Sequence, residues 1–179
     1  PAAEYEGVGP DGPIPGTARW NPLLEIPRGN QETAPVQNLV ELLTNSEEHD
    51  QNPHWRLTAT QLLVGVVLHV LYARPNKTIA GVYEFLNDPN QDIREALDEM
   101  LQTEHLEGQP HPVVAQTARN MMNKADAELS GVVSTASSYL SLWQDPLVAA
   151  NTSESDFAID DIANLDHPVS LYLVVGPQD

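Results

Sequence analysis

The feature that most limits the fold of this chain is a long apolar segment framed by two prolines. Proline is accepted in the first turn of a helix and stops a helix that reaches it, so Pro53 and Pro75 predict a helix over residues 54–73. Its apolar residues recur at helical spacing, and Val64 and Leu68 add a second apolar face. A helix that is apolar on several sides has to be covered by other helices. We therefore expect it at the buried centre of a bundle.

Five more segments repeat the helical pattern, and one of them is expected to cross the central helix closely. Gly65 lies in the middle of the central helix, where glycine costs about 1 kcal/mol of stability relative to alanine. We expect that another helix crosses closely at this position, which would explain the glycine. No sequence period recurs. The predicted fold class is mainly all-α, a multi-helix bundle of about six helices. The five segments begin near Thr33 and Thr78, both expected N-caps, and near Ile93, His111 and Asp126, the last running to Gln144.

The two ends of the chain do not share this pattern. Residues 1–19 are rich in glycine and proline, which predicts a flexible linker or tail without helix or strand. Residues 169–175 form a short apolar run typical of a fully buried strand. No other segment offers a convincing partner strand, and an unpaired strand leaves its backbone groups unsatisfied. Either this C-terminal strand pairs with another molecule, or it belongs to a truncated α/β domain.

Charge and cysteine content narrow the range of functions. The 26 acidic and 8 basic residues give a formal net charge of -18 at pH 7, which repels phosphate backbones and anionic membranes. Cationic partners are favoured, although excess acid also serves solubility alone. Cysteine is absent, which excludes disulfides and thiolate metal sites. The first ten residues do not resemble a signal peptide, and no apolar run reaches the roughly 20 residues of a bilayer span.

No group of residues has the spacing of a catalytic or metal site. The six histidines lack metal-site spacing; His69 is expected in the core or an interface, and only His105 and His111 are expected to meet across a turn. The serines of residues 130–141 lack a nucleophile elbow. The aspartates of residues 156–166 lack the glycine and glutamate of a calcium loop and are expected to cap a short helix. The sequence predicts no catalytic residue and no metal ligand.

The best candidate for a functional site is a set of acids on the fourth predicted helix and just after it. Arg94 is the only cation among them, and like charges at i, i+4 cost about 0.2 to 0.5 kcal/mol per pair. With Leu97 and Met100 turned toward the core, the acids are expected to point outward. They form either a binding site for a basic partner or an ordinary solvated face. The predicted partner-binding residues are Asp92, Glu95, Asp98, Glu99, Glu104 and Glu107.

Several distinctive stretches follow one another from about residue 19 to the end of the chain. They include Trp20–Leu23, Leu62–Val66, His111–Ala115, Asp145-Pro146 and Pro168–Val175. In this order and spacing the chain resembles the TraG-like coupling proteins of conjugation and type IV secretion. Residues 1–18 show no resemblance to that family, and Gly176-Pro177-Gln178 stands where the family is expected to have a proline-rich turn ending in serine.

The resemblance implies a domain plan. In that family an all-helical domain is inserted into the RecA-like nucleotide-binding domain of a membrane-anchored hexameric motor. The chain then divides into a linker or tail (1–19), an all-helical substrate-recognition domain (20–150) and a return segment with a strand of the nucleotide-binding domain (151–179). The parent would use ATP and magnesium. Neither a Walker A nor a Walker B motif is present here, so we expect no enzyme activity and no cofactor in this chain.

The resemblance also implies partners and a location. The helical domain would receive relaxases, accessory relaxosome proteins or effector translocation signals, in the cytoplasm at the inner face of the bacterial inner membrane. Its acids would recognise basic signals by charge complementarity. Two alternatives stay open: a DNA-contacting part of the DNA-translocating motor, and a structural spacer within the hexamer.

Overall fold

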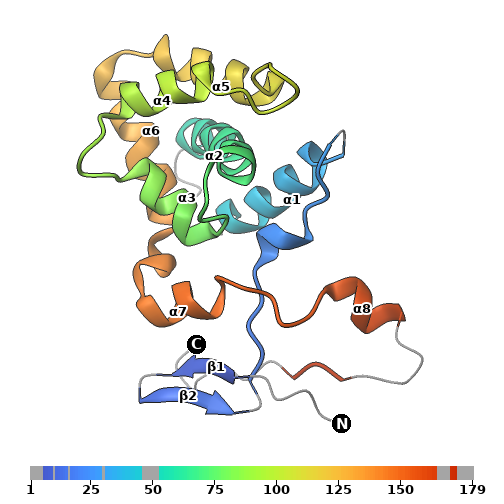
Figure 1. The fold of residues 1–179 in the computed structure, drawn as a ribbon. Helices are drawn as coiled ribbons and strands as arrows, with labels where there is room; N and C mark the ends of the chain where they lie inside the picture. Colours follow the sequence, from blue (N-terminus) through green and yellow to red (C-terminus); the bar gives the residue numbers. More distant parts are fainter. Residues whose placement is uncertain are drawn as a thin grey trace.

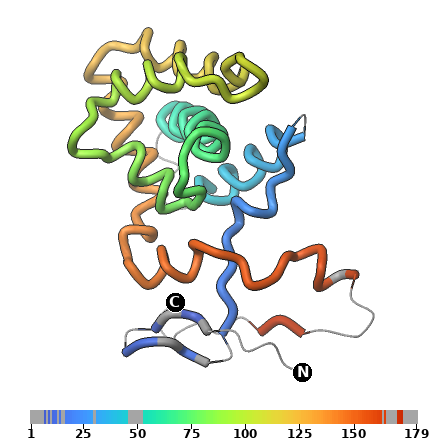
Figure 2. Tube along the Cα trace, viewed as in Figure 1, coloured from blue at the N-terminus to red at the C-terminus, as the bar shows by residue number. Residues whose placement is uncertain are grey.

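The computed structural model describes residues 6–9, 11–15, 17–29, 31–45, 53–164 and 170–172. Figures 1 and 2 show α1 to α6 gathered in one bundle, with the hairpin, α7 and α8 beneath it. The predicted mainly all-α bundle is confirmed. In chain order the elements, with η for a 3-10 helix, are β1 (Glu6–Gly9), β2 (Gly12–Pro15), η1 (Pro22–Glu25), α1 (Thr33–Thr44), α2 (Pro53–Ala73), α3 (Ile79–Leu86), α4 (Ile93–Gln102), α5 (Pro112–Met122), α6 (Asp126–Tyr139), η3 (Ser141–Gln144), α7 (Pro146–Asn151) and α8 (Ile159–Asn164).

The central helix is α2, as its flanking prolines predict. Residues 62–71 of α2 are buried without interruption, and α1, α3, α5 and α6 pack against it. In Figure 1 α2 is seen nearly end on, with the other helices of the bundle around it. By length and composition α2 is apolar enough to cross a membrane, but the bundle covers most of its surface. Its apolar residues therefore form the core of this fold.

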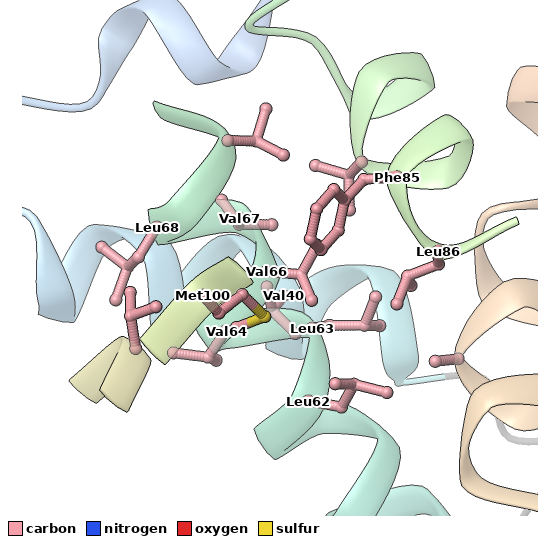
Figure 3. Close-up of a cluster of buried hydrophobic side chains, with 14 of the residues drawn as sticks. Val40, Leu62, Leu63, Val64, Val66, Val67, Leu68, Phe85, Leu86 and Met100 are labelled. Atoms are coloured by element: carbon pink, nitrogen blue, oxygen red, sulfur yellow. The ribbon is translucent and has the colours of Figure 1, made fainter. Parts of the chain in front are cut away.

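Side chains from the outer helices complete this core. In Figure 3 Val40 of α1, Phe85 of α3 and Met100 of α4 gather around the valines and leucines of α2. Each of the three is at most 6% exposed. Full burial of a side chain of this size contributes about 1.5 to 3 kcal/mol, so the contacts with α2 are a main source of stability.

The close helix crossing predicted at Gly65 is confirmed. A Cβ atom placed on Gly65 would lie 2.6 Å from the Cβ of Thr117 on α5. Carbon atoms prefer separations of about 3.5 to 4.0 Å, so a methyl group does not fit there. The glycine lets the backbones of α2 and α5 approach, which holds α5 against the middle of the core.

The start of α1 differs from the prediction. Thr78 caps α3 as expected, accepting a hydrogen bond of 2.9 Å from the N–H of Gly81. Thr33, however, is the first residue of α1, and Glu32 occupies the N-cap position without a capping hydrogen bond from its side chain. The reason is tertiary, because the Glu32 carboxylate is turned into the interior, where the hydroxyl of Tyr72 donates to it at 2.9 Å.

The last long helix is also shorter than predicted. The sequence predicts a helix to Gln144, but α6 ends at Tyr139 and η3 follows. The Nε1–H of Trp143 donates to Thr152 at 3.0 Å, which ties η3 to the end of α7. The short helix predicted near Ile162 is confirmed as α8.

The structure of the N-terminal residues also differs from the prediction. The sequence predicts no strand in residues 1–19, yet β1 and β2 pair as an antiparallel hairpin, with Gly9 opposite Gly12. The φ of Gly12 is +123°, a conformation that residues with a Cβ rarely adopt. The N–H of Gly7 donates to the Thr17 hydroxyl at 2.9 Å, and β1 contacts α7. The glycines that argue against a strand thus form its turn and its close contacts.

The segments that enter and leave the bundle lie side by side. The N–H of Trp20 donates to the carbonyl of Asn151, and the N–H of Asp156 donates to the carbonyl of Arg19, both at 3.0 Å. The guanidinium of Arg19 also pairs with Asp156 at 3.1 Å and with Glu154 at 2.8 Å. Both ends of the helical part therefore meet at one junction.

Asn21 holds this junction together. Its side chain is buried and donates to the carbonyls of Lys77 at 2.9 Å and Ser153 at 3.2 Å. Its Oδ1 accepts from the N–H of Leu23 and so caps η1, while its own N–H donates to Ser155. One buried amide joins the entry segment, the start of α3 and the return segment.

The predicted C-terminal strand is only partly within the described residues. Residues 170–172 are exposed and not part of a strand, and 169 and 173–175 lie outside the described part. A strand needs a hydrogen-bonded neighbour, and none reaches these three residues in the described part of the chain. The boundaries at residues 20 and 150 stay a prediction.

Candidate partner-binding surface

The predicted acids lie on α4 and on the turn that follows it. Ala96, Leu97 and Met100 form the buried side of α4, which faces the bundle. α4 lies on the outside of the bundle in Figure 1. Five of the six acids are exposed, as the apolar stripe predicts, and their role in binding stays a prediction. We call these five the acidic surface: Asp92, Glu95, Asp98, Glu104 and Glu107.

Two members of the acidic surface also stabilise α4. The Asp92 side chain accepts a hydrogen bond of 2.8 Å from the N–H of Arg94, and the Glu95 carboxylate accepts one of 3.0 Å from the N–H of Asp92. This reciprocal arrangement is a capping box, which satisfies the free N–H groups of the first turn. Negative charge at this end also complements the helix dipole.

The sixth predicted acid, Glu99, does not point outward, which corrects the prediction. Its Oε1 lies 3.3 Å from Nε2 of the buried His69, and its Oε2 accepts from Arg74 at 2.7 Å and from Gln91 at 3.0 Å. Position 99 lies at the edge of the apolar stripe, where a long side chain can reach either solvent or α2. Its three partners are supplied from outside α4, so periodicity within α4 does not reveal them.

A tight turn presents the last two acids. Leu106 and Gln109 form an isolated antiparallel bridge around Glu107 and Gly108, whose φ values are +27° and +82°. Glu104 and Glu107 are exposed at this turn, and neither forms a hydrogen bond or ion pair within the described residues. Their carboxylates are therefore free to contact another molecule.

Arg94 does not neutralise the acidic surface. Its guanidinium pairs with Asp126 at the start of α6 and donates to the carbonyl oxygens of Met122 and Lys124. Beside it, Asp92 and Asp126 border an open hollow of about 490 Å³ between α4 and α6. Sequence reasoning missed Asp126 as a neighbour of this surface, because it lies on another helix and its proximity is set by packing.

A chain of three histidines runs under the acidic surface. The N–H of His111 donates to Nδ1 of His105 at 3.2 Å, so a neutral His105 carries its proton on Nε2. That nitrogen lies 2.9 Å from Nδ1 of His69, whose Nε2 then donates to Glu99. The expected meeting of His105 and His111 is confirmed, and so is the buried position of His69. Nothing in the sequence indicates that all three meet.

Burial lowers the pKa of two of these histidines and so favours their neutral forms. Burial, followed by the nearby His69 and His111, lowers the pKa of His105 to about 4. Burial also lowers the pKa of His69, although Glu99 acts in the opposite direction. An uncharged His105 can both accept from a backbone N–H and donate to His69, which its protonated form cannot do.

Glu32 is a further buried member of this cluster, on the other side of His111. Its Oε1 accepts from the Tyr72 hydroxyl at 2.9 Å and from Nε2 of His111 at 3.1 Å. Burial alone raises the pKa of Glu32, but hydrogen bonds from its own N–H, Tyr72 and His111 lower it below its usual value.

Among the described residues, no three or more acids and histidines are grouped as a metal site. The cluster therefore connects α1, α2, α4 and α5 as a structural network.

Comparison with known proteins identifies the family. Residues 12–179 match the family described as type IV secretory system conjugative DNA transfer. The chain belongs to this family. It is 44% identical over 169 residues to a conjugal transfer protein TraG of Escherichia coli, which covers 92% of this chain and 27% of that protein. A second conjugal transfer protein TraG of Escherichia coli is 44% identical over 165 residues, covering 89% of this chain and 26% of that protein.

The match confirms the family that the sequence resembles. It begins at residue 12, however, so the prediction that all of residues 1–18 lie outside the family is wrong for residues 12–18. The chain spans about a quarter of the length of these curated relatives. No solved structure matches it. The acidic surface, the histidine chain and the junction at Asn21 all fall within the matched residues 12–179.

Proposed function

We propose that this chain is the substrate-recognition helical domain of a conjugative coupling protein. Its acidic surface binds basic segments of relaxases, accessory relaxosome proteins or effectors. The observation that carries the proposal is five exposed carboxylates on one helix and its following turn, none of them in an ion pair among the described residues. A cationic segment replaces their mutual repulsion by attraction, which raises association rate and selectivity.

The junction supports placing this domain as an insert in a larger protein. An inserted domain needs its entry and exit close together, and here Trp20 and Asn151 are joined by a backbone hydrogen bond of 3.0 Å. The parent would be a membrane-anchored motor that uses ATP and magnesium to move DNA, with this domain on its cytoplasmic side. Family membership and the 44% identity to TraG proteins support that assignment.

The test reverses charge only where the fold does not use it. The side chains of Asp98 and Glu104 are exposed and have no hydrogen bond or ion pair within the described chain, unlike those of the capping acids and Glu99. We expect the double variant Asp98→Lys, Glu104→Lys to weaken binding of an arginine-rich relaxase peptide at least tenfold, about 1.4 kcal/mol, by fluorescence anisotropy at low salt. The same variant should unfold at nearly the same temperature as the unchanged chain, because exposed charges contribute about 0 to 1 kcal/mol.

A matched control separates local recognition from net charge. Asp160→Lys, Asp161→Lys changes the net charge equally on α8, at the other end of the molecule from α4 (Figure 1). It should weaken binding of the same peptide much less than the α4 variant does. Equal losses of peptide affinity in the two variants would show that the net charge of the chain, and not the acidic surface in particular, determines binding. Sub-micromolar binding of duplex DNA at physiological salt would favour the DNA-contacting alternative instead.

A further inference from the structure

A second candidate site lies on another part of the bundle. A groove of about 450 Å³ runs between α1, α2 and α5, and no residue of the acidic surface lines it. Its floor is formed by Val64 of α2 and by Thr117 and Met121 of α5, which are 6%, 8% and 1% exposed. The close crossing at Gly65 sets this floor, because it draws α5 onto α2.

The rim of the groove is unusually rich in primary amides. Five of them come from three helices, and all five side chains are exposed. None has a hydrogen-bond partner among the residues that the structure describes. The amides are Gln37 and Asn38 of α1, Gln61 of α2, and Gln116 and Asn120 of α5.

The charge of the groove excludes one class of ligand. Among the residues that the structure describes, Glu41 is its only charged lining residue, and no lysine or arginine of that part lines it. Binding of nucleic acid depends on neutralising phosphates with cations, and the described lining of this groove supplies none in a chain of net charge -18. Phosphorylated and other anionic ligands are disfavoured for the same reason.

We propose that this groove binds an extended polypeptide segment of a partner protein through hydrogen bonds between the rim amides and the partner's backbone. A primary amide carries a donor and an acceptor side by side, as a peptide group does. A helical partner has already satisfied its backbone groups, whereas an extended one leaves them free. Alternate side chains of an extended segment point the same way, so one set enters the apolar floor. Glu41 at the rim favours a basic residue in that segment.

This site goes beyond the proposed function, because it lies apart from the acidic surface and uses neutral hydrogen bonds. The probe is a blocked peptide of about seven residues in which valine and serine alternate around a central lysine. Titrated into the 15N-labelled chain, it should shift the side-chain NH2 signals of the five rim amides in the NMR spectrum. The same peptide with N-methyl groups on its valines loses the backbone N–H donors of those valines and should bind at least tenfold more weakly.

Two variants locate the contact. Gln61→Leu with Gln116→Leu keeps a side chain of similar size but removes two rim amides. This double variant should weaken binding of the peptide at least fivefold. Gln102→Leu with Gln144→Leu makes the same chemical change at exposed positions outside the groove and should leave affinity unchanged. Asp98→Lys with Glu104→Lys should also leave it unchanged, which separates this site from the acidic surface.

Three outcomes would overturn the proposal. The first is that the rim amide signals do not move, and the second is that the N-methylated peptide binds as well as the parent peptide. The third is that a single-stranded oligonucleotide shifts the same signals while the peptide does not. A peptide that shifts the signals of Asp98 and Glu104 in place of the rim amides would count for the acidic surface and against the groove.

Discussion

Acid should destabilise this fold through its buried histidine chain. The pKa of His105 is about 4 in the folded chain, against about 6.5 for an unperturbed histidine. When a histidine pKa is lowered by folding, the unfolded chain takes up the proton first as the pH falls. Stability is therefore fully present above about pH 6.5 and is lost progressively between about pH 6.5 and pH 4. His69 acts in the same direction, because burial lowers its pKa as well.

The size of this effect follows from the two pKa values of His105. At pH 5 the unfolded imidazole is almost fully protonated while the folded one is mostly neutral, which corresponds to about 2 kcal/mol. The structure explains why the folded chain resists protonation: His105 is 8% exposed, and its Nδ1 already accepts the N–H of His111 at 3.2 Å. A loss of this size is a large part of the roughly 5 to 15 kcal/mol that stabilises a domain.

The assay is urea unfolding at pH 7.5 and pH 5.0, comparing the unchanged chain with His105→Gln. Glutamine keeps a donor for His69 but does not titrate. At pH 7.5 the variant should be less stable by about 1 to 3 kcal/mol, because the buried N–H of His111 loses its acceptor. Between pH 7.5 and 5.0, however, it should lose about 2 kcal/mol less than the unchanged chain.

Comparison with a variant is needed because the 26 acidic residues also change protonation in acid. His54→Gln is the control: the His54 side chain is 63% exposed, and its Nε2 lies 3.7 Å from Glu128 in an ion pair at the surface. This variant should differ from the unchanged chain in acid much less than His105→Gln does, because exposed ion pairs contribute about 0 to 1 kcal/mol. An equal loss in His105→Gln would refute the reasoning, because it would assign the acid sensitivity to groups outside the histidine chain.

Three further changes test the packing. Gly65→Ala should lower stability by about 1 to 3 kcal/mol, because its Cβ would meet Thr117 at 2.6 Å, and a higher melting temperature would contradict the close crossing. Asn21→Ala should cost at least about 2 kcal/mol in urea unfolding, since it leaves two carbonyls without a donor and removes a cap; an unchanged midpoint would mean that water replaces these bonds. Glu99→Lys should cost about 2 kcal/mol or more, whereas Asp98→Lys should cost less than about 1 kcal/mol, and equal costs would show that Glu99 is only a surface charge.

Much of the helical bundle follows from local signals in the sequence. Pro53 and Pro75 frame α2, and Thr78 caps α3 through its own hydroxyl. These signals act within one or two turns of backbone, so they are readable without tertiary contacts. Gly65 is a similar case, because a glycine retained in a buried helix needs a packing reason.

Two of the departures from prediction, at Glu32 and Glu99, share one cause. Glu32 gives up the capping role because Tyr72 and His111 attract its carboxylate into the interior. Glu99 turns inward because the buried His69 offers it a donor. Each partner is tens of residues away in the chain, so periodicity within a single helix carries no sign of it.

The sequence by itself determined the class of this protein: an acidic, mainly helical bundle around one apolar helix, in a family that its distinctive stretches identify. Tertiary structure alone decided which polar groups meet. It joined three histidines to Glu99, placed Asp126 beside Asp92, and gathered five amides around one groove. The physical reason is that helix formation depends on spacing along the chain. The environment of a polar side chain depends instead on which helix faces pack together.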